Sequence, residues 1–430
     1  MSKWQQTTLG EVLGDGGGKI QTGPFGSQLH ASDYVESGIP CIMPANMKNN
    51  RVNLLGIAFI AEKDAQRLSQ HLVKEGDIVY SRRGDVTQKA LIGKTEIGYF
   101  CGTGCLLVRP GDAIDPEFLT YHLSTPSNQS WIIKQAVGAT MPSLNTAILS
   151  KVPLNLPPNK GTQKKVATVL SALDAKIDCN NRINAELEAM AKTLYDYWFV
   201  QFDFPDANGK PYKSSGGKMV YNATLKREIP VGWEARKLGQ YISLERGVTY
   251  GKEDVCTSNT KNAVGVLRAT NVTANVIDTD DLVYVPDSKL SLAQTMTKFS
   301  TLMVMSSGSK EHVGKNGIYF FDEPLGFGAF CSKITSDTNS RYFVNTFLQS
   351  KWFRAYIKNQ CLGTNINNLT NDHINNCPTI GADPRVSRLF EETLKAHYEK
   401  MAVNTVENRS LKQLRDWLLP LLMSGQVTVA

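Results

Sequence analysis

The stretch TQKKVATVLSALDAKIDCNNRINAELEAMAKTLYDYWFV, residues 162–200, decides the architecture that the sequence predicts. Its inward-facing positions recur at alternating spacings of four and three residues, the 3.5-residue average of a coiled-coil seam, which is the line of contact between two supercoiled helices. At 1.5 Å per residue, a helix of this length would span roughly 55–60 Å. The seam consists of Val166, Leu170, Leu173, Ile177, Asn180, Asn184, Leu187, Ala191, Leu194 and Trp198.

A second seam with the same spacing lies near the end of the chain, and its positions match those of the first at one constant offset, from Val166 against Phe390 to Trp198 against Leu422. An internal repeat of this kind marks a repeated structural unit, so the partner of the first helix is expected in the same chain, in an antiparallel arrangement. Asp383 and Pro384 are placed to begin this second helix, as N-cap and first helical residue. The second seam consists of Phe390, Leu394, His397, Met401, Asn404, Asn408, Leu411, Arg415, Leu418 and Leu422.

Each seam carries two asparagines, Asn180 and Asn184 in the first and Asn404 and Asn408 in the second. A buried asparagine lowers the stability of a coiled coil but fixes its register and orientation. We therefore predict that these residues lock the register of the helix pair. The alternative is that one asparagine of each pair faces solvent.

Each long helix follows a stretch of short strands and helices bounded by Gly, Pro and Asn. In the first half we expect strands at 39–43, 77–80 and 105–108, and helices at 116–124 and 130–137. The predicted fold class is α+β, with two mixed α/β globules in pseudo-repeat, separated by two long helices that form an antiparallel coiled coil. The expected segments are a globule at 1–158, a helix at 159–204, a connector at 205–231, a globule at 232–382 and a helix at 383–425.

Composition limits the classes of function. The 430 residues are 41% hydrophobic and 20% charged, which is typical of a globular protein, and the net charge of +7 fits binding to a polyanion without requiring it. No apolar run approaches the roughly 18 residues of a membrane span, and the N-terminus lacks an apolar signal core. The eight cysteines form no Cys-x-x-Cys pair and are not grouped with the six histidines. We expect neither a metal site nor disulfides, and a cytoplasmic location.

Motifs for catalysis are missing from the sequence. No Asn-Pro-Pro-Tyr/Phe motif of amino-methyltransferases, no Gly-x-Gly cofactor turn after a strand and no Ser-His-Asp arrangement is present. The segment 308–316 has glycines like those of a phosphate loop, but Asn316 stands where such a loop has Ser or Thr. A binding protein is therefore expected rather than an enzyme.

Polar loops at matching places of the two halves are candidate DNA contacts. Arginine can bind guanine or phosphate in a bidentate manner, and glutamine can pair with adenine. For any single residue the alternative is an ordinary turn, since Asn, Ser and Thr are common there. Arg82 and Arg83 are the strongest candidates. The first half contributes Asn46, Lys48, Arg51, Arg82, Arg83, Gln88, Lys89, Ser143 and Asn145, and the second half contributes Arg268, Asn271, Ser307, Lys310, Lys315, Thr364, Asn365 and Asn367.

Both long helices end in more apolar bulk than a two-helix seam needs. Trp198, Phe199, Trp417 and Leu421 are therefore candidates for docking a partner subunit. The alternative is that these segments pack against the globules of their own chain.

Several stretches together resemble the specificity subunits of type I restriction–modification systems. The resemblance implies two target-recognition domains that each read one half of a bipartite, asymmetric site in double-stranded DNA, with the helices as a ruler. It also implies binding of two methyltransferase (modification) subunits and, through them, of restriction/translocase subunits. No cofactor is then bound by this chain, S-adenosylmethionine, ATP and Mg being expected on the partners. The stretches are Thr22–Tyr34, Gly76–Gly84, Leu154–Pro158, Leu187-Glu188 with Trp198-Phe199, and Leu411–Pro420 with Met423–Gly425.

Two other functions stay open from the sequence. The chain could be a coiled-coil scaffold whose globules bind proteins rather than DNA, or an enzyme with its own nuclease or methyltransferase activity. The second globule has Ser-Ser-Gly (306–308) where the first has Ser-Arg-Arg-Gly (81–84), so its DNA contacts are the less secure inference. The bases read cannot be deduced, because no code relates such loops to base pairs.

Overall fold

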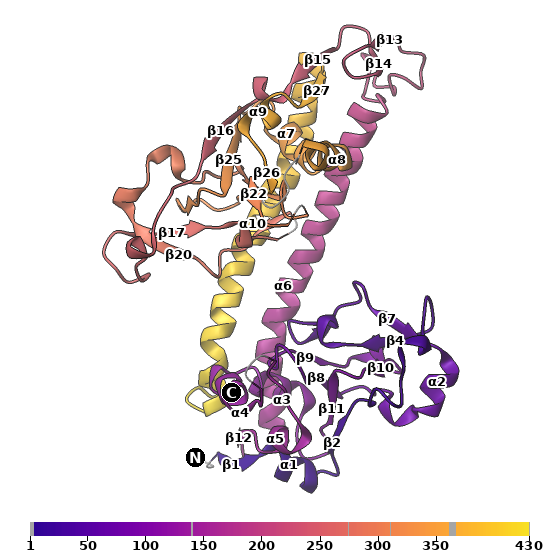
Figure 1. Cartoon of the computed structure of the whole chain (residues 1–430), viewed down its shortest axis with the longest axis vertical. Coiled ribbons are helices and arrows are strands. Elements are labelled where there is room, and N and C mark those ends of the chain that lie inside the picture. Colours follow the sequence, from indigo (N-terminus) through magenta and orange to yellow (C-terminus); the bar gives the residue numbers. More distant parts are fainter. Residues whose placement is uncertain (1–3, 139–140, 274, 310, 361–366, 430) are drawn as a thin grey trace. The chain divides into compact units, whose positions relative to one another are not determined.

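The computed structural model describes residues 4–138, 141–273, 275–309, 311–360 and 367–429. The chain forms two compact units, unit 1 with residues 1–177 and 410–430 and unit 2 with residues 178–409. Each unit contains one globule and a segment of both long helices (Figure 1). The division therefore passes through the helices, and the expected domain limits at their ends stay a prediction.

The two long helices are α6 (Lys160–Tyr195), which continues as a π-helical turn (Asp196–Val200), and α10 (Pro384–Ser424). Asn159 caps the first, since its side-chain oxygen accepts from the backbone N–H of Thr162 at 2.9 Å. The carboxylate of Asp383 accepts from the N–H of Arg385 at 2.8 Å, as expected for a helix that starts at Pro384. Both predicted helices are confirmed.

The seam asparagines show how the helices pair in unit 2. Asn180 Nδ2 donates to Asn408 Oδ1, and Asn404 Nδ2 donates to Asn184 Oδ1, both at 2.9 Å. From Asn180 to Asn184 along α6, the partners on α10 run backward from Asn408 to Asn404, so the helices are antiparallel, as predicted. Asn180 and Asn404 are fully buried. The asparagines thus lie between the helices, while their role as a register lock stays a prediction.

In unit 1 the globule surrounds a four-stranded sheet of order β2-β11-β8-β9. Successive residues of a strand point to opposite faces, and β8 shows this directly. Ile78 and Tyr80 pack in one core cluster with α1, α3 and α6, whereas Val79 packs in another with the second sheet. The strands are β2 (Lys19–Thr22), β8 (Ile78–Ser81), β9 (Lys89–Leu91) and β11 (Cys105–Arg109), and the second sheet holds β3 (Tyr34–Val35), β4 (Ile39–Ile42), β7 (Ala58–Ile60) and β10 (Phe100–Cys101).

Short helices accompany the sheets of unit 1. The predicted helix at 116–124 is confirmed as α3, and the one at 130–137 begins earlier, because Thr125 caps it and Pro126 is its first residue. Asn145, expected in a loop, caps a short helix instead. The helices are α1 (Leu9–Asp15), α2 (Glu62–Arg67), α3 (Pro116–His122), α4 (Pro126–Gln135) and α5 (Thr146–Ser150), and β1 (Gln5–Thr8) pairs with β12 (Pro153–Leu156).

Unit 2 has a six-stranded sheet of order β16-β25-β21-β23-β19-β18. The expected connector forms a hairpin of its own, β13 (Met219–Asn222) with β14 (Arg227–Pro230). The remaining elements are β15 (Glu234–Lys237), β16 (Ile242–Arg246), β17 (Ala263–Leu267), β18 (Val272–Thr273), β19 (Val276–Ile277), β20 (Val283–Pro286), β21 (Thr301–Val304), β22 (Ser306–Ser307), β23 (Asn316–Ile318), β24 (Gly326–Phe327), β25 (Cys331–Ser336), β26 (Asn367–Asn368), β27 (Pro378–Gly381), α7 (Arg341–Leu348), α8 (Lys351–Gln360) and α9 (Asn371–Asn375).

Buried polar contacts attach the unit 1 globule to α6. Gln163 is 3% exposed, and its Oε1 accepts from the N–H of Asp115, just before α3, at 2.8 Å. Further along, the Tyr121 hydroxyl donates to Asp174 Oδ2 at 2.6 Å. Helix α3 is thus held to α6 at both of its ends.

Unit 2 repeats these contacts with other side chains. The carboxylate of Glu391 on α10 accepts from the N–H groups of Tyr342 and Phe343, at the start of α7, at 2.9 and 2.8 Å. The hydroxyls of Thr346 and Tyr398 lie 2.9 Å apart. Burial raises the pKa of the Glu391 carboxyl to about 7. The pseudo-repeat therefore extends to the contacts between helix and globule.

Candidate nucleic-acid interface

The loop between β8 and β9, residues 82–88, is ordered by its own side chains. The N–H of Ser81 donates to the carbonyl of Gln88 at 2.8 Å and closes the loop. Asp85 accepts from the Thr87 N–H at 3.0 Å and from Gln88 Nε2 at 2.9 Å. These bonds hold the arginines of the loop on a defined backbone.

The predicted loops that carry Arg83 and Ser143 meet in unit 1. Arg83 and Ser143 form a β-bridge, and the N–H of Leu144 donates to the carbonyl of Arg82 at 2.9 Å. Two segments that are far apart in the sequence therefore present their side chains together.

Unit 2 builds the same junction at equivalent positions. Ser307 in β22 pairs with Asn367 in β26, and these two residues match Arg83 and Ser143 at the offset that relates the two helix seams. The N–H of Leu369 donates to the carbonyl of Met305 at 2.8 Å. The backbone junction is thus repeated, whereas its side chains differ between the units.

Of the two arginines, Arg83 is the more available. Its side chain is exposed, and its guanidinium makes no hydrogen bond or ion pair with the residues that the structure describes. Arg82 is half-buried, its guanidinium carbon lies 5.9 Å from the ring centroid of Phe25, and its Nε is buried without a partner among the described residues. A guanidinium held over an aromatic ring is positioned to present its remaining donors outward.

Sequence reasoning missed two exposed aromatic residues at these junctions. Phe25, next to Arg82, is 53% exposed. Phe330 in unit 2 is 67% exposed, and its carbonyl accepts from the N–H groups of Met305 and Ser306 at 2.8 and 3.3 Å. The only signal in the sequence is a single aromatic residue close to glycine, in Gly-Pro-Phe-Gly (23–26) and Gly-Ala-Phe (328–330).

The prediction that Asn46 and Asn271 contact DNA is wrong, because both are buried and hold turns. Asn46 is 3% exposed, accepts from the N–H of Met43 at 3.2 Å and donates to the carbonyl of Asn53 at 3.3 Å. Asn271 is 2% exposed, accepts from the N–H of Arg268 at 2.8 Å and donates to two carbonyls of the following loop. The match between the two residues reflects one structural role used twice.

Three further candidates are engaged within the fold. Lys89 is 2% exposed, because as the first residue of β9 it points inward opposite Tyr80, so it does not lie on the loop surface as expected, and its contact with DNA stays a prediction. Arg268 donates to Asp281 Oδ2 at 2.7 Å, which occupies part of its guanidinium. Asn145 accepts from the N–H of Ile148 as a helix cap.

The other candidates lie as follows. Lys48 and Arg51 are on the hairpin of β5 (Met47–Lys48) and β6 (Arg51–Val52), where both are exposed. The turn residues Asn49 and Asn50 have φ values of 52° and 61°, as a type I′ turn requires. Gln88, Ser307 and Lys315 are half-buried, whereas Lys310, Thr364 and Asn365 fall outside the described residues.

The docking candidates divide into two kinds. Trp198 and Phe199 are 5% and 1% exposed, with ring centroids 5.5 and 4.8 Å from that of Phe390. Their prediction as a docking face is wrong, and the alternative, packing in the core of unit 2, is confirmed. Trp417 is 63% exposed and Leu421 is half-buried on α10, so their role stays a prediction.

Within the described ranges, no group of three or more His, Cys, Asp and Glu side chains is arranged to hold a metal ion. No helix there combines the length and apolar character needed to cross a bilayer.

Sequence comparison places the chain among known proteins. Residues 1–189 match the family model described as type I restriction modification DNA specificity domain. The specificity subunit of the type I restriction enzyme MjaIX from Methanocaldococcus jannaschii is 26% identical over 407 residues, which cover 92% of this chain and 88% of the relative. The specificity subunit of the type I restriction enzyme HindI from Haemophilus influenzae is 22% identical, with 99% and 100% of the two chains covered.

Comparison of structures agrees with the sequence. The S subunit of a type I restriction–modification system from M. genitalium matches with a TM-score of 0.54 and 14% identity, covering 98% of this chain and 96% of that chain. At this identity the match shows a shared fold. The family model over residues 1–189, the two relatives of nearly equal length and the fold agree with one another: the chain is similar over nearly its whole length to specificity subunits of type I restriction enzymes.

Proposed function

We propose that the chain reads a bipartite, asymmetric site in double-stranded DNA, one half with each globule. The observation that carries this proposal is the loop junction that recurs in both units, Arg83 with Ser143 and Ser307 with Asn367. One backbone arrangement with different side chains is what reading two different base sequences in one binding mode requires, because side chains at base edges specify sequence.

Basic side chains supply the affinity that does not depend on sequence. Arg83, Lys48 and Arg51 are exposed in unit 1, and the whole chain carries a net charge of +7. Each phosphate contact releases counterions, so DNA binding should weaken steeply with salt. Phe25 and Phe330 would add apolar contact next to the reading loops.

The chain also acts as an assembly scaffold in this proposal. On α10 an apolar stripe includes Leu414 (42% exposed) and Trp417 (63%). On α6 the position equivalent to Leu414 in the repeat is Met190 (56%), with Tyr197 (36%) further along. Exposed apolar residues on both long helices suit two copies of one partner, the methyltransferase subunits, through which restriction/translocase subunits join. S-adenosylmethionine, ATP and Mg then belong to those partners.

Methylome sequencing of a host that carries the complete system tests the proposal. The informative variant replaces Arg82 and Arg83 with Ser, which copies Ser306 and Ser307 of the second junction. We expect the methylated site to relax in one half, with the other half and the unspecified spacer unchanged. A variant whose methylated site is unchanged, or is altered in both halves, would contradict the assignment of one half-site to each globule.

A gel-shift assay of the purified complex separates this function from that of a protein-binding scaffold. The complex should shift DNA that carries its site, and the shifted fraction should fall as salt is raised from about 50 to about 200 mM. Absence of any salt-sensitive shift would favour globules that bind proteins.

A further inference from the structure

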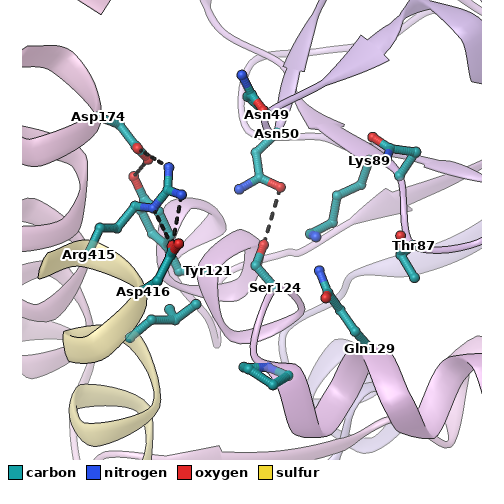
Figure 2. Close-up of a pocket in the computed structure, with 13 residues that line it drawn as sticks. Asn49, Asn50, Thr87, Lys89, Tyr121, Ser124, Gln129, Asp174, Arg415 and Asp416 are labelled. Carbon is teal, nitrogen blue, oxygen red and sulfur yellow. Dashed lines mark hydrogen bonds and ion pairs between the residues drawn. The ribbon is translucent and has the colours of Figure 1, made fainter. Parts of the chain in front are cut away.

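Unit 1 contains a cavity of about 430 Å³ between its globule and its segments of the long helices. Figure 2 shows two polar ends in this cavity. Asn50, Lys89, Ser124 and Gln129 point into one end, and the Arg415 group lies at the other. The site is distinct from the loop junction that carries the proposed reading of DNA.

Lys89 is the unexplained residue of this cavity. Its side chain is 2% exposed, and its Nζ forms no hydrogen bond with any residue in the described part of the chain. It lies 5.9 Å from the ring centroid of Tyr80, whose hydroxyl is likewise buried without a partner among the described residues. A buried ammonium group is costly unless an opposite charge and acceptors accompany it.

Uncommitted donors surround the amine. Ser124 Oγ donates to Asn50 Oδ1 at 3.2 Å, which leaves the amide nitrogen of Asn50 available to a ligand. The amide of Gln129 makes no hydrogen bond with the described residues, and Figure 2 shows it directed toward the same space as the Lys89 amine. This end of the cavity therefore offers one cation and two amide donors.

The carboxylates that line the cavity are hydrogen-bonded at the other end. Arg415 donates to Asp174 and to Asp416, both at 2.8 Å, and the Tyr121 hydroxyl donates to Asp174 at 2.6 Å. Both acidic residues are thus paired with Arg415, and neither is available to Lys89. The Lys89 amine thus has no carboxylate within hydrogen-bond distance among the described residues, and Asp85 acts on it only at longer range.

Unit 2 shows that the fold does not need this lysine. By strand register Lys89 lies opposite Tyr80, and Asn316 lies opposite Met303 in the equivalent strand pair. Asn316 is fully engaged there, donating to two backbone carbonyls and accepting from Gln349 at 2.7 Å.

In the matching cavity of unit 2, the arginine also has a partner within the chain. It holds about 250 Å³ and is lined by Asn275, the counterpart of Asn50, and by Arg354. Arg354 donates to Asn275 Oδ1 at 2.8 Å, so its charge has a partner within the chain. Of the two cavities, only that of unit 1 holds a buried cation without a partner among the described residues, and a ligand is the simplest physical reason for it.

We propose that the unit 1 cavity binds a phosphate group, with Lys89 as its cation and the amides of Asn50 and Gln129 as further donors. Hydrogen bonds from a charged amine to an oxyanion are among the strongest in proteins. The phosphate comes either from the DNA backbone, in which case this inference rests on the proposed function, or from a free phosphate or nucleotide, in which case it does not.

Binding should be accompanied by proton uptake near neutral pH. Burial lowers the pKa of Lys89 to about 7, against a smaller raising effect of the nearby Asp85 carboxylate. The other ionisable groups on the cavity wall are Tyr121 and the paired Asp174, Arg415 and Asp416. Because an oxyanion stabilises the ammonium form, the bound state should hold the proton to higher pH.

The test compares wild type, Lys89→Met and the control Lys63→Met, which removes an equal charge from an exposed position on α2, outside the cavity. Met is close to lysine in shape and needs no charge partner, so Lys89→Met should fold; Gln129→Leu serves as a second variant that leaves the charge unchanged. The first arm measures the thermal shift of the full chain in inorganic phosphate against chloride of equal ionic strength. The second measures the salt dependence of DNA binding by the assembled complex.

Loss of the phosphate-dependent thermal shift in Lys89→Met but not in Lys63→Met supports a site for free phosphate. A slope of log K against log salt that falls by about 0.9 in Lys89→Met, with no thermal shift in any protein, supports a DNA phosphate. If Lys89→Met and Gln129→Leu match wild type in both arms, the proposal is overturned. A wild-type complex that binds no DNA refutes the proposed function instead, and the first arm then decides the cavity alone.

Discussion

Arg83→Ala should weaken DNA binding by the assembled complex without weakening the fold. The Arg83 side chain is exposed and makes no hydrogen bond or ion pair with described residues, so removing it should change the free energy of unfolding by no more than about 0.5 kcal/mol. Its neighbour Arg82 packs over Phe25, so Arg82→Ala should cost both stability and binding. Arg83→Ala is thus the cleaner measurement.

The size of the effect identifies the group that Arg83 contacts. A bidentate contact to a base is worth about 1–3 kcal/mol, which corresponds to a loss of affinity of roughly 5- to 150-fold that disappears on DNA altered at that base. If Arg83 contacts a phosphate, its removal lowers the slope of log K against log salt by about 0.9. The loss of affinity then depends on salt and changes about 3.5-fold between about 50 and 200 mM. A base contact changes specificity, whereas a phosphate contact weakens all sequences alike.

Fluorescence anisotropy with labelled duplexes at several salt concentrations measures both quantities, and Lys63→Ala, an exposed charge on α2 away from the junction, is the control. Circular dichroism of both variants checks that the fold is intact. If affinity, salt slope and footprint of the Arg83→Ala and Arg82→Ala double variant all equal those of wild type, the assignment of this loop to DNA is refuted.

Three further predictions concern the helices. Burial raises the pKa of the Glu391 carboxyl from 4.5 to about 7, so its contribution to stability is present below pH 4.5 and is lost as pH rises through 7. In urea denaturation, the free energy of unfolding of wild type should therefore fall by about 3 kcal/mol between pH 4.5 and 8, relative to that of Glu391→Gln. Parallel pH profiles of the two proteins would contradict this. Asn180→Leu alone should lower the free energy of unfolding by about 1–3 kcal/mol, because it removes the donor to the buried Asn408. The double variant Asn180→Leu with Asn408→Leu should recover stability and let cysteine cross-links between the helices form in more than one register. A single register in the double variant would exclude the register lock. Inserting one heptad after Ile177 and one after Arg409 lengthens each helix by about 10 Å. The unspecified spacer of the methylated site should then grow by roughly three base pairs. A changed half-site with an unchanged spacer would refute the idea that the helices set the spacer length.

The sequence by itself determined the helices, their antiparallel pairing and the repeat. These features depend on local periodicity and on a long-range match of residue types, and both can be read along a chain. The apolar seam, the N-cap at Asp383 and the strands β8 and β11 are features of this kind. The pairing of Asn180 with Asn408 also follows once the two seams are aligned in opposite directions.

Only the tertiary structure decided which polar residues are available to a ligand. Asn46, Asn271 and Lys89 are polar residues of the kind usually found at the surface, yet all three are buried. The two asparagines hold turns, and Lys89 lies in a cavity. Conversely, Phe25 is apolar but exposed. Exposure depends on contacts between segments far apart in sequence, such as the bridge of Arg83 to Ser143, and no local pattern encodes them.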